Sequence, residues 1–202
     1  MAKHFNTHTE RLDLGFWQEF IMSHGKQLMF PKGRYLACSG ECTVELGFVT
    51  SGYFRYEVDS CNQKTVIGGF AFPAALVGDY PRCLYGERAL FSIVAGEDTE
   101  CYVMDASVIP AMCDTDPALE RQCRLIMESA YLSLSERHCN LYALSPKERY
   151  VELLRQHPQI IQHVPLREIA SYLNISPIHL SRIRRELLTG TTQESRNSGW
   201  NL

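Results

Sequence analysis

The chain has 202 residues, of which 45% are hydrophobic and 21% are charged, and it therefore suits one large or two small globular domains and excludes a disordered or fibrous protein. The formal net charge is −3, but from residue 145 onward eight Lys and Arg face five Asp and Glu, so this part carries +3 and the rest −6. A small basic part attached to a larger acidic one is typical of a nucleic-acid-binding protein with a second function.

The beginning of the chain lacks the basic-then-apolar pattern of a secretory signal. The longest uncharged run, 65–78, is too short and too rich in Gly and Pro to span a bilayer. We therefore expect a cytoplasmic protein with no membrane partner. The cysteines contain no C-x-x-C pair and are predicted to be small buried hydrophobic residues in a reducing compartment, although Cys38 and Cys42 could instead form a redox pair.

Residues 1 to about 27 show a moderately helical pattern and predict a helical lead-in that packs on the next part of the chain. From residue 28 to about 105, short apolar runs alternate with turns such as Pro31-Lys32-Gly33 and Ser51-Gly52. This spacing indicates a small all-β sandwich or roll. Strands are predicted at 27–30, 35–38, 46–50, 53–58, 65–72, 91–95 and 100–104.

A longer insertion at 73–90 interrupts this β pattern with Gly78-Asp79-Tyr80-Pro81 and Gly86-Glu87-Arg88. Loops that interrupt a rigid scaffold are frequent ligand-binding sites. Gly78, Asp79 and Arg88 are therefore candidate effector-binding residues.

A helix of about 25 residues is predicted from Pro117 through about Ala143, because apolar residues recur along it at spacings of three, four and seven. Such a seam is typical of a helix that pairs with its own copy; the alternative is that the helix packs only on its own β-roll. The predicted dimer seam comprises Leu119, Cys123, Ile126, Ala130, Leu134 and Leu141.

The remaining residues predict a small helical domain that ends in a helix-turn-helix. Ser145-Pro146 caps a helix that ends before Pro158, and two short amphipathic helices follow at 166–173 and from 177. Asn174 suits the turn between them, because Asn tolerates the left-handed conformation. Ser176 and Pro177 are an N-cap and first-position signal for the second helix. Gly190 is predicted to end that helix, and the polar residues 191–202 are expected to be loose.

In the second of these helices, Leu180, Ile183 and Leu187 turn inward at 100° per residue. The arginines of this helix therefore lie toward its outward face, which is basic. Such a face suits the DNA major groove, where Arg pairs with guanine O6 and N7. The alternative is an ordinary αα-hairpin in a helical core. The candidate DNA-binding residues are Arg167, Ser176, Pro177, Ile178, Ser181, Arg182, Arg184 and Arg185, with Arg167 expected to contact the backbone.

A β-roll, a long central helix, a Ser-Pro-initiated helix and a C-terminal helix-turn-helix resemble, in this order, the Crp/Fnr superfamily of bacterial transcription regulators. The resemblance covers nearly the whole chain and is closest over 144–154 and 164–186, in a subgroup that ends soon after the recognition helix. It implies an α+β fold: a cyclic-nucleotide-binding-like effector roll at 1–115, a dimerisation helix at 116–144 and a helix-turn-helix domain at 145–202. The implied partners are double-stranded DNA, a second copy of the chain and RNA polymerase.

The sequence departs from the family pattern in three places: the cyclic-nucleotide site, the iron–sulfur cysteines and the recognition helix. Cyclic-nucleotide members carry Gly-Glu and then a phosphate-binding Arg followed by Ser or Thr, whereas Gly78-Asp79 and Phe91-Ser92 stand here. Losing that charge-assisted pair costs about 1.5–3 kcal/mol, so cAMP is not expected, although Arg88 lies in the same loop. Phe91 and Ser92 join the candidate effector-binding residues.

Iron–sulfur members of the family group their cysteines near the N-terminus, whereas the first cysteine here is Cys38, so no cluster, metal or cofactor is expected. In the recognition helix, Pro177 and Ile178 stand where many members have Arg and Glu. Arg182 best matches a base contact of the family. The short tail leaves little sequence for the β-wing of many members.

Two alternatives accompany the regulator hypothesis. A cupin-like enzyme is disfavoured, because the histidines lie outside the predicted strands and no hydrolase triad, phosphate loop or H-E-x-x-H occurs, so no catalytic residue is predicted. An effector-free dimeric regulator keeps the fold but treats the roll as a scaffold. We expect a homodimeric DNA-binding regulator of near-palindromic sites, controlled by an unidentified small molecule bound in the roll.

Overall fold

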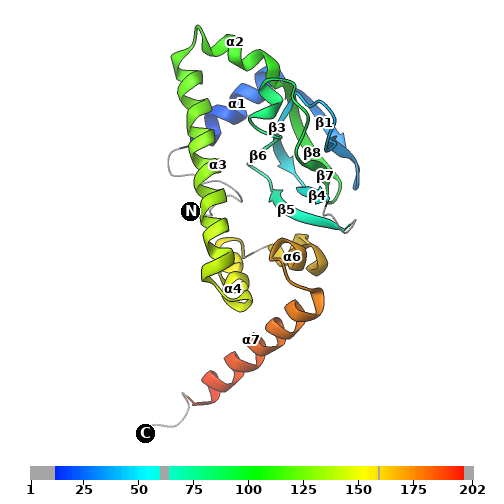
Figure 1. Cartoon of the computed structure of the whole chain (residues 1–202), viewed down its shortest axis with the longest axis vertical. Coiled ribbons are helices and arrows are strands. Elements are labelled where there is room, and N and C mark those ends of the chain that lie inside the picture. Colours follow the sequence, from blue (N-terminus) through cyan, green and yellow to red (C-terminus); the bar gives the residue numbers. More distant parts are fainter. Residues whose placement is uncertain (1–11, 60–63, 159, 198–202) are drawn as a thin grey trace. The chain divides into compact units, whose positions relative to one another are not determined.

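The computed structural model describes residues 12–59, 64–158 and 160–197. The chain divides into two compact units, Met1–Ala143 and Leu144–Leu202 (Figure 1). Among the described residues, no helix is both long and apolar enough to cross a membrane.

The first unit contains a β-roll of two four-stranded antiparallel sheets, ordered β1-β8-β3-β6 and β2-β7-β4-β5. Every strand predicted from the sequence is present, with bounds within one residue of the prediction. The short strand β6 lies inside the predicted insertion and pairs with β3. It was not predicted, since two residues are too few to show a period. The strands are β1 (Lys26–Phe30), β2 (Tyr35–Ala37), β3 (Glu45–Ser51), β4 (Phe54–Asp59), β5 (Thr65–Ala71), β6 (Leu76–Val77), β7 (Ser92–Ala95) and β8 (Thr99–Asp105).

The interior of the roll is filled by inward-facing side chains of both sheets, among them the fully buried Val49, Phe54 and Ile93. Gly96 follows β7 where the ring of Tyr53 passes over the backbone: a Cβ there would lie 2.1 Å from that ring. Only glycine fits this position. The Tyr53 ring, which fills the core, therefore determines which residue can stand at position 96.

Helices cover the outside of the roll. Helix α1 (Leu14–His24) begins at Asp13, whose side chain accepts a hydrogen bond from the backbone N–H of Phe16 at 3.0 Å. It packs on β3 and β8 and buries Trp17 and Ile21 completely. The chain then passes through the short helices η1 (Arg82–Leu84), η2 (Ala106–Val108) and α2 (Ile109–Cys113).

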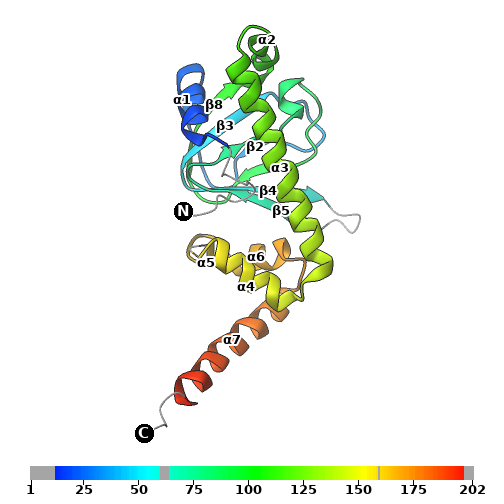
Figure 2. The same cartoon turned by 90° about the vertical axis from the view of Figure 1, so that its left-hand side faces the viewer.

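The long helix α3 (Pro117–Ala143) runs along one side of the roll (Figure 2) and confirms the predicted bounds. Leu119 and Ile126, in its first half, are buried in the same cluster as Trp17, Ile21 and Ile109. The guanidinium of Arg137, in its second half, donates to the carbonyl of Gly68 on β5.

The second unit is helical: α4 (Pro146–Gln156), α5 (Ile160–His163), α6 (Leu166–Tyr172) and α7 (Pro177–Asn197). The predicted start of α4 is a full capping box, in which the Ser145 hydroxyl accepts from the Glu148 N–H at 3.3 Å and the Glu148 carboxylate accepts from the Ser145 N–H at 2.8 Å. Its small core includes Tyr150, Leu153, Ile160, Val164, Ile169, Ala170, Leu173, Leu180 and Ile183.

The predicted end of the last helix at Gly190 is wrong, because α7 continues to Asn197. One glycine costs a helix about 1 kcal/mol relative to alanine and does not by itself end it. Good helix formers follow, including Gln193, Glu194 and Arg196, and no proline stops the chain. The expected loose tail is therefore helical up to Asn197, and its remainder, 198–202, lies outside the described residues.

Candidate functional site

The turn between α6 and α7 is a Schellman motif. Asn174 has φ 55°, the left-handed conformation predicted for it. The N–H of Ile175 donates to the Ala170 carbonyl at 3.0 Å, and the N–H of Asn174 donates to the Ser171 carbonyl at 3.0 Å. These bonds satisfy the last carbonyls of α6 and set the angle at which α7 departs.

Helix α7 begins as predicted, at Pro177. The Ser176 hydroxyl accepts from the N–H of His179 at 3.2 Å, so this side chain caps the helix. The Ser181 hydroxyl donates to the Pro177 carbonyl one turn back, at 2.9 Å. The two serines predicted to contact DNA thus also bond to their own helix.

The outward face of α7, which we call the reading face, comprises Ile178, Ser181, Arg182 and Arg185. All four are exposed, and Ile178 is 69% exposed although it is aliphatic. Leu180 and Ile183, on the opposite side, are buried. The reading face thus joins two fixed positive charges to a small polar and an apolar group, with Pro177 exposed beside it.

Arg184 lies apart from the reading face. It is half-buried and hydrogen-bonds the side chain of Tyr150 on α4. Burial raises the pKa of the Tyr150 phenol, and the neighbouring charge of Arg184 only partly offsets this rise. Helical spacing placed Arg184 at the edge of the outward face. In the structure its side chain instead contacts the Tyr150 phenol on α4.

Arg149 on α4 is a residue that sequence analysis missed. Its guanidinium donates to the Leu144 carbonyl at 2.8 Å and to the Leu173 carbonyl at 3.2 Å. Leu173 is the C-cap of α6, where partial negative charge gathers, so Arg149 stabilises the end of α6 just before the turn. Only its place one turn into a capped helix was visible in the sequence. Arg167 is exposed in the first turn of α6.

The candidate effector residues gather in the roll, where the segment 78–92, which we call the effector loop, meets residues 39–42. Asp79 is buried, and its Oδ2 accepts from the Leu90 N–H at 2.5 Å. Arg88 donates to the Gly40 carbonyl at 2.6 Å. The Ser92 hydroxyl accepts from the Ser39 N–H at 3.0 Å. These three polar side chains therefore all bond within the roll.

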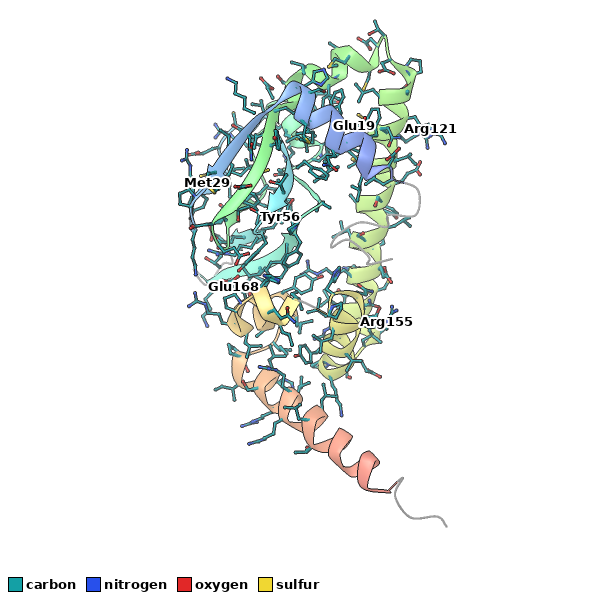
Figure 3. The ribbon with its side chains drawn as sticks, turned by 180° about the vertical axis from the view of Figure 1, so that it is seen from behind. Glu19, Met29, Tyr56, Arg121, Arg155 and Glu168 are labelled. Atoms are coloured by element: carbon teal, nitrogen blue, oxygen red, sulfur yellow. The ribbon has the colours of Figure 1, made fainter. Side chains whose placement is uncertain are left out.

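Tyr56 on β4 (Figure 3) completes this region and was not among the predicted residues. Its hydroxyl accepts from the Gly78 N–H at 3.4 Å, and its ring meets Phe91 edge to face, with centroids 5.9 Å apart. Burial raises the pKa of Tyr56 above its usual value. An aromatic pair therefore lies beside the buried carboxylate of Asp79. Within the described ranges, no group of three or more His, Cys, Asp or Glu is arranged to hold a metal.

No protein-family model matches the sequence, and a search of curated proteins gives no match. Solved structures match its fold. FixK2 from Bradyrhizobium japonicum has 17% identity and a TM-score of 0.75, covering 83% of this chain and 86% of that one. The c-di-GMP responsive global regulator CLP from Xanthomonas campestris has 15% identity and a TM-score of 0.67, covering 89% and 93%.

A third match, assigned to the Crp/Fnr family of transcriptional regulators, comes from Eubacterium rectale, with 16% identity, a TM-score of 0.67 and coverage of 86% and 82%. The chain has the Crp/Fnr fold. The fold class expected from the sequence, α+β with an antiparallel β-roll and a long helix, is confirmed.

Within this Crp/Fnr fold, the six predicted seam residues of α3 divide between two faces. Leu119 and Ile126 are buried in the core of their own unit, and Cys123 is half-buried there. Ala130, Leu134 and Leu141 are exposed. Apolar spacing predicts that a residue is covered, but it does not show which part of the protein covers it. The predicted seam therefore combined residues from two different faces of the helix.

The exposed apolar face of α3 follows a different set of residues, which we call the α3 stripe. Its members recur at alternating spacings of four and three, the period of a coiled-coil seam. Tyr131 is 69% exposed and Leu134 67% exposed, values unusual for large apolar side chains. The stripe consists of Met127, Tyr131, Leu134, His138 and Leu141.

Proposed function

We propose that this protein is a DNA-binding transcription regulator that acts as a homodimer on near-palindromic sites. The observation that carries the proposal is the reading face of α7, exposed and basic at the start of a helix that follows a left-handed turn. The Crp/Fnr fold, which extends over both units, supports it. RNA polymerase is the partner through which such a regulator would act.

The side chains of the reading face suit different parts of a DNA site. Arg182 is proposed to read guanine through a bidentate pair, while Pro177 and Ile178 offer apolar contact to a thymine methyl group. Ser181 and Arg185 flank these contacts. Arg167, exposed in the first turn of α6, is proposed to bind a phosphate and to position the helix without selecting bases.

The homodimer is proposed to form along the α3 stripe. Two copies of a seam with this spacing bury their apolar residues against each other. Pairing through α3 would give two reading faces, which must lie about 34 Å apart to enter successive major grooves. The stripe replaces the seam predicted from the sequence, because Leu119 and Ile126 are already buried.

The roll either binds a small-molecule effector or serves as an effector-free scaffold. The bonds of the effector loop favour the effector-free scaffold. Asp79, Arg88 and Ser92 each bond within the roll, so an incoming phosphate would have to break the bond of Arg88 to Gly40. We expect cAMP and c-di-GMP to leave the melting temperature unchanged. A concentration-dependent rise with either would establish an effector.

The function is tested by selecting bound sequences from a random DNA duplex pool at near-physiological salt. We expect a palindrome with half-sites one turn apart. The double variant Arg182→Ala, Arg185→Ala should lose the enrichment, while Arg155→Ala, which removes an exposed arginine of α4, should keep it. No enrichment, either alone or with added cell metabolites, would overturn the proposal.

A further inference from the structure

Two cysteines meet where α2 joins α3. Cys113 is the last residue of α2, and Cys123 lies in the second turn of α3. Their sulfur atoms are 3.8 Å apart, and both side chains are half-buried. A disulfide requires a sulfur separation of about 2 Å, so the two sulfurs need to approach by about 2 Å more.

The backbone between the two cysteines holds them in place. The N–H groups of Thr115 and Asp116 donate to the Met112 carbonyl at 3.2 and 3.0 Å. The Asp116 carboxylate accepts from the N–H groups of Ala118 and Leu119 at 2.9 and 3.1 Å and caps α3. We call this segment, 113–123, the α2–α3 corner (Figure 1). Its geometry keeps the two thiols together.

The corner is also tied to the effector loop. The Tyr80 hydroxyl donates to the Cys123 carbonyl at 3.2 Å. A third thiol, Cys83, is fully buried in the core cluster against which Cys113 and Cys123 pack. A cross-link at the corner would therefore form beside the contact that joins the effector loop to α3.

We propose that Cys113 and Cys123 form a reversible disulfide when the protein meets a peroxide, and that this pair is a redox modification site. In the first step the Cys113 thiolate attacks one peroxide oxygen, the O–O bond breaks, and the leaving hydroxide takes a proton to become water. Cys113 is then a sulfenic acid. In the second step the Cys123 sulfur attacks the Cys113 sulfur, the S–O bond breaks, and a second water leaves with the Cys123 proton. Two thiols and one peroxide give one disulfide and two waters.

The order of the two steps follows from the surroundings of the thiols. Burial, and then the neighbouring Cys113, raise the pKa of Cys123, so this thiol loses its proton less readily and is the poorer one to start the reaction. It acts in the second step, where its proton leaves with the water. Cys83, whose pKa burial also raises, is a poor first nucleophile for the same reason. A dithiol reductant reverses the cross-link by exchange.

The test uses the purified full-length protein, fully reduced and then treated with hydrogen peroxide before free thiols are alkylated. A protease that cuts after acidic residues releases peptides 106–114 and 121–128, each with one cysteine. We expect mass spectrometry to find these two peptides linked after oxidation and separate after treatment with dithiothreitol. The cross-link should also raise the melting temperature by roughly 5 °C, since it restricts the unfolded chain.

Variants separate this pair from the other thiols. Cys113→Ser and Cys123→Ser should each lose the linked peptides and the rise in melting temperature, measured against their own reduced forms. Cys139→Ser, which removes an exposed cysteine of the same helix, should keep both. The proposal is overturned if both peptides of the oxidised wild-type protein are found alkylated, if Cys83 is the partner found, or if the rise persists in Cys113→Ser. None of these readouts depends on DNA binding.

Discussion

The reading face of α7 and the effector loop of the roll use arginine in opposite ways. Arg182 and Arg185 extend into solvent, whereas Arg88 donates to the Gly40 carbonyl, and Ser92 and the buried Asp79 accept backbone N–H groups. Polar groups that are already paired give up a bond before they can bind a ligand, and exposed ones exchange only water. The difference indicates that the reading face is prepared for a partner and that the effector loop mainly holds the roll together.

The largest expected effect separates the two sides of α7. Leu180→Ala should lower the free energy of unfolding by about 3 kcal/mol, because it empties a fully buried site. Ile178→Ala, which removes a side chain of similar size from the reading face, should change it by less than about 0.5 kcal/mol. Urea unfolding measures both, and an equal loss would mean that Ile178 is covered within the folded protein.

The second prediction concerns the effector loop. Asp79→Ala should lower the free energy of unfolding by about 2–3 kcal/mol, because the Leu90 N–H loses a charged acceptor in a buried place. The control is Glu87→Ala in the same loop, where an exposed ion pair with Arg82 contributes little. If Asp79→Ala leaves stability unchanged, the bond from the Leu90 N–H does not hold the loop in place.

The third prediction compares two arginines of α7. Arg182→Ala should weaken binding to the selected DNA site by about 1–3 kcal/mol and relax one base position, with the melting temperature unchanged. Arg184→Ala should instead lower the melting temperature, because Tyr150 loses its partner, and should keep the base preference. Fluorescence anisotropy on matched and altered duplexes measures the first effect. An equal loss on random DNA would assign Arg182 to phosphate.

The smallest expected effect is at the capping box of α4. Hydrogen bonds from the Ser145 hydroxyl and N–H lower the pKa of Glu148, so its stabilising contribution is present above the ordinary glutamate pKa and is lost as the pH falls through the lowered value. Glu148→Gln should therefore make stability depend less on pH below about 4.3. Parallel profiles for the two proteins would show that the box does not respond to pH.

Local signals predicted the elements well, because each depends on a few neighbouring residues. Strand bounds followed from short apolar runs between turns, and Asn174, Ser176 and Pro177 define the turn and the helix start through their own backbone preferences. The prediction at Gly190 was wrong because it also relied on a single residue. The residues after Gly190 continue the helix.

What the sequence left open depends on partners distant along the chain. Apolar spacing could not show that Leu119 and Ile126 meet their own core while Leu134 stays exposed. Arg184 and Arg149 looked alike as helical arginines until Tyr150 and the Leu173 carbonyl appeared beside them. Cys113 and Cys123 were predicted only as buried small residues, since ten positions separate them and a folded corner is needed to join their sulfurs.

The bond from Arg149 to the Leu173 carbonyl has a consequence for how this unit could be moved between proteins. The turn and α7 are held from α4, by Arg149 at one end and by Tyr150 against Arg184 at the other. A segment that starts at α6 would carry the reading face without the two contacts that orient it. The smallest portable form of the reading face therefore begins at Leu144, whose carbonyl is the second acceptor of Arg149.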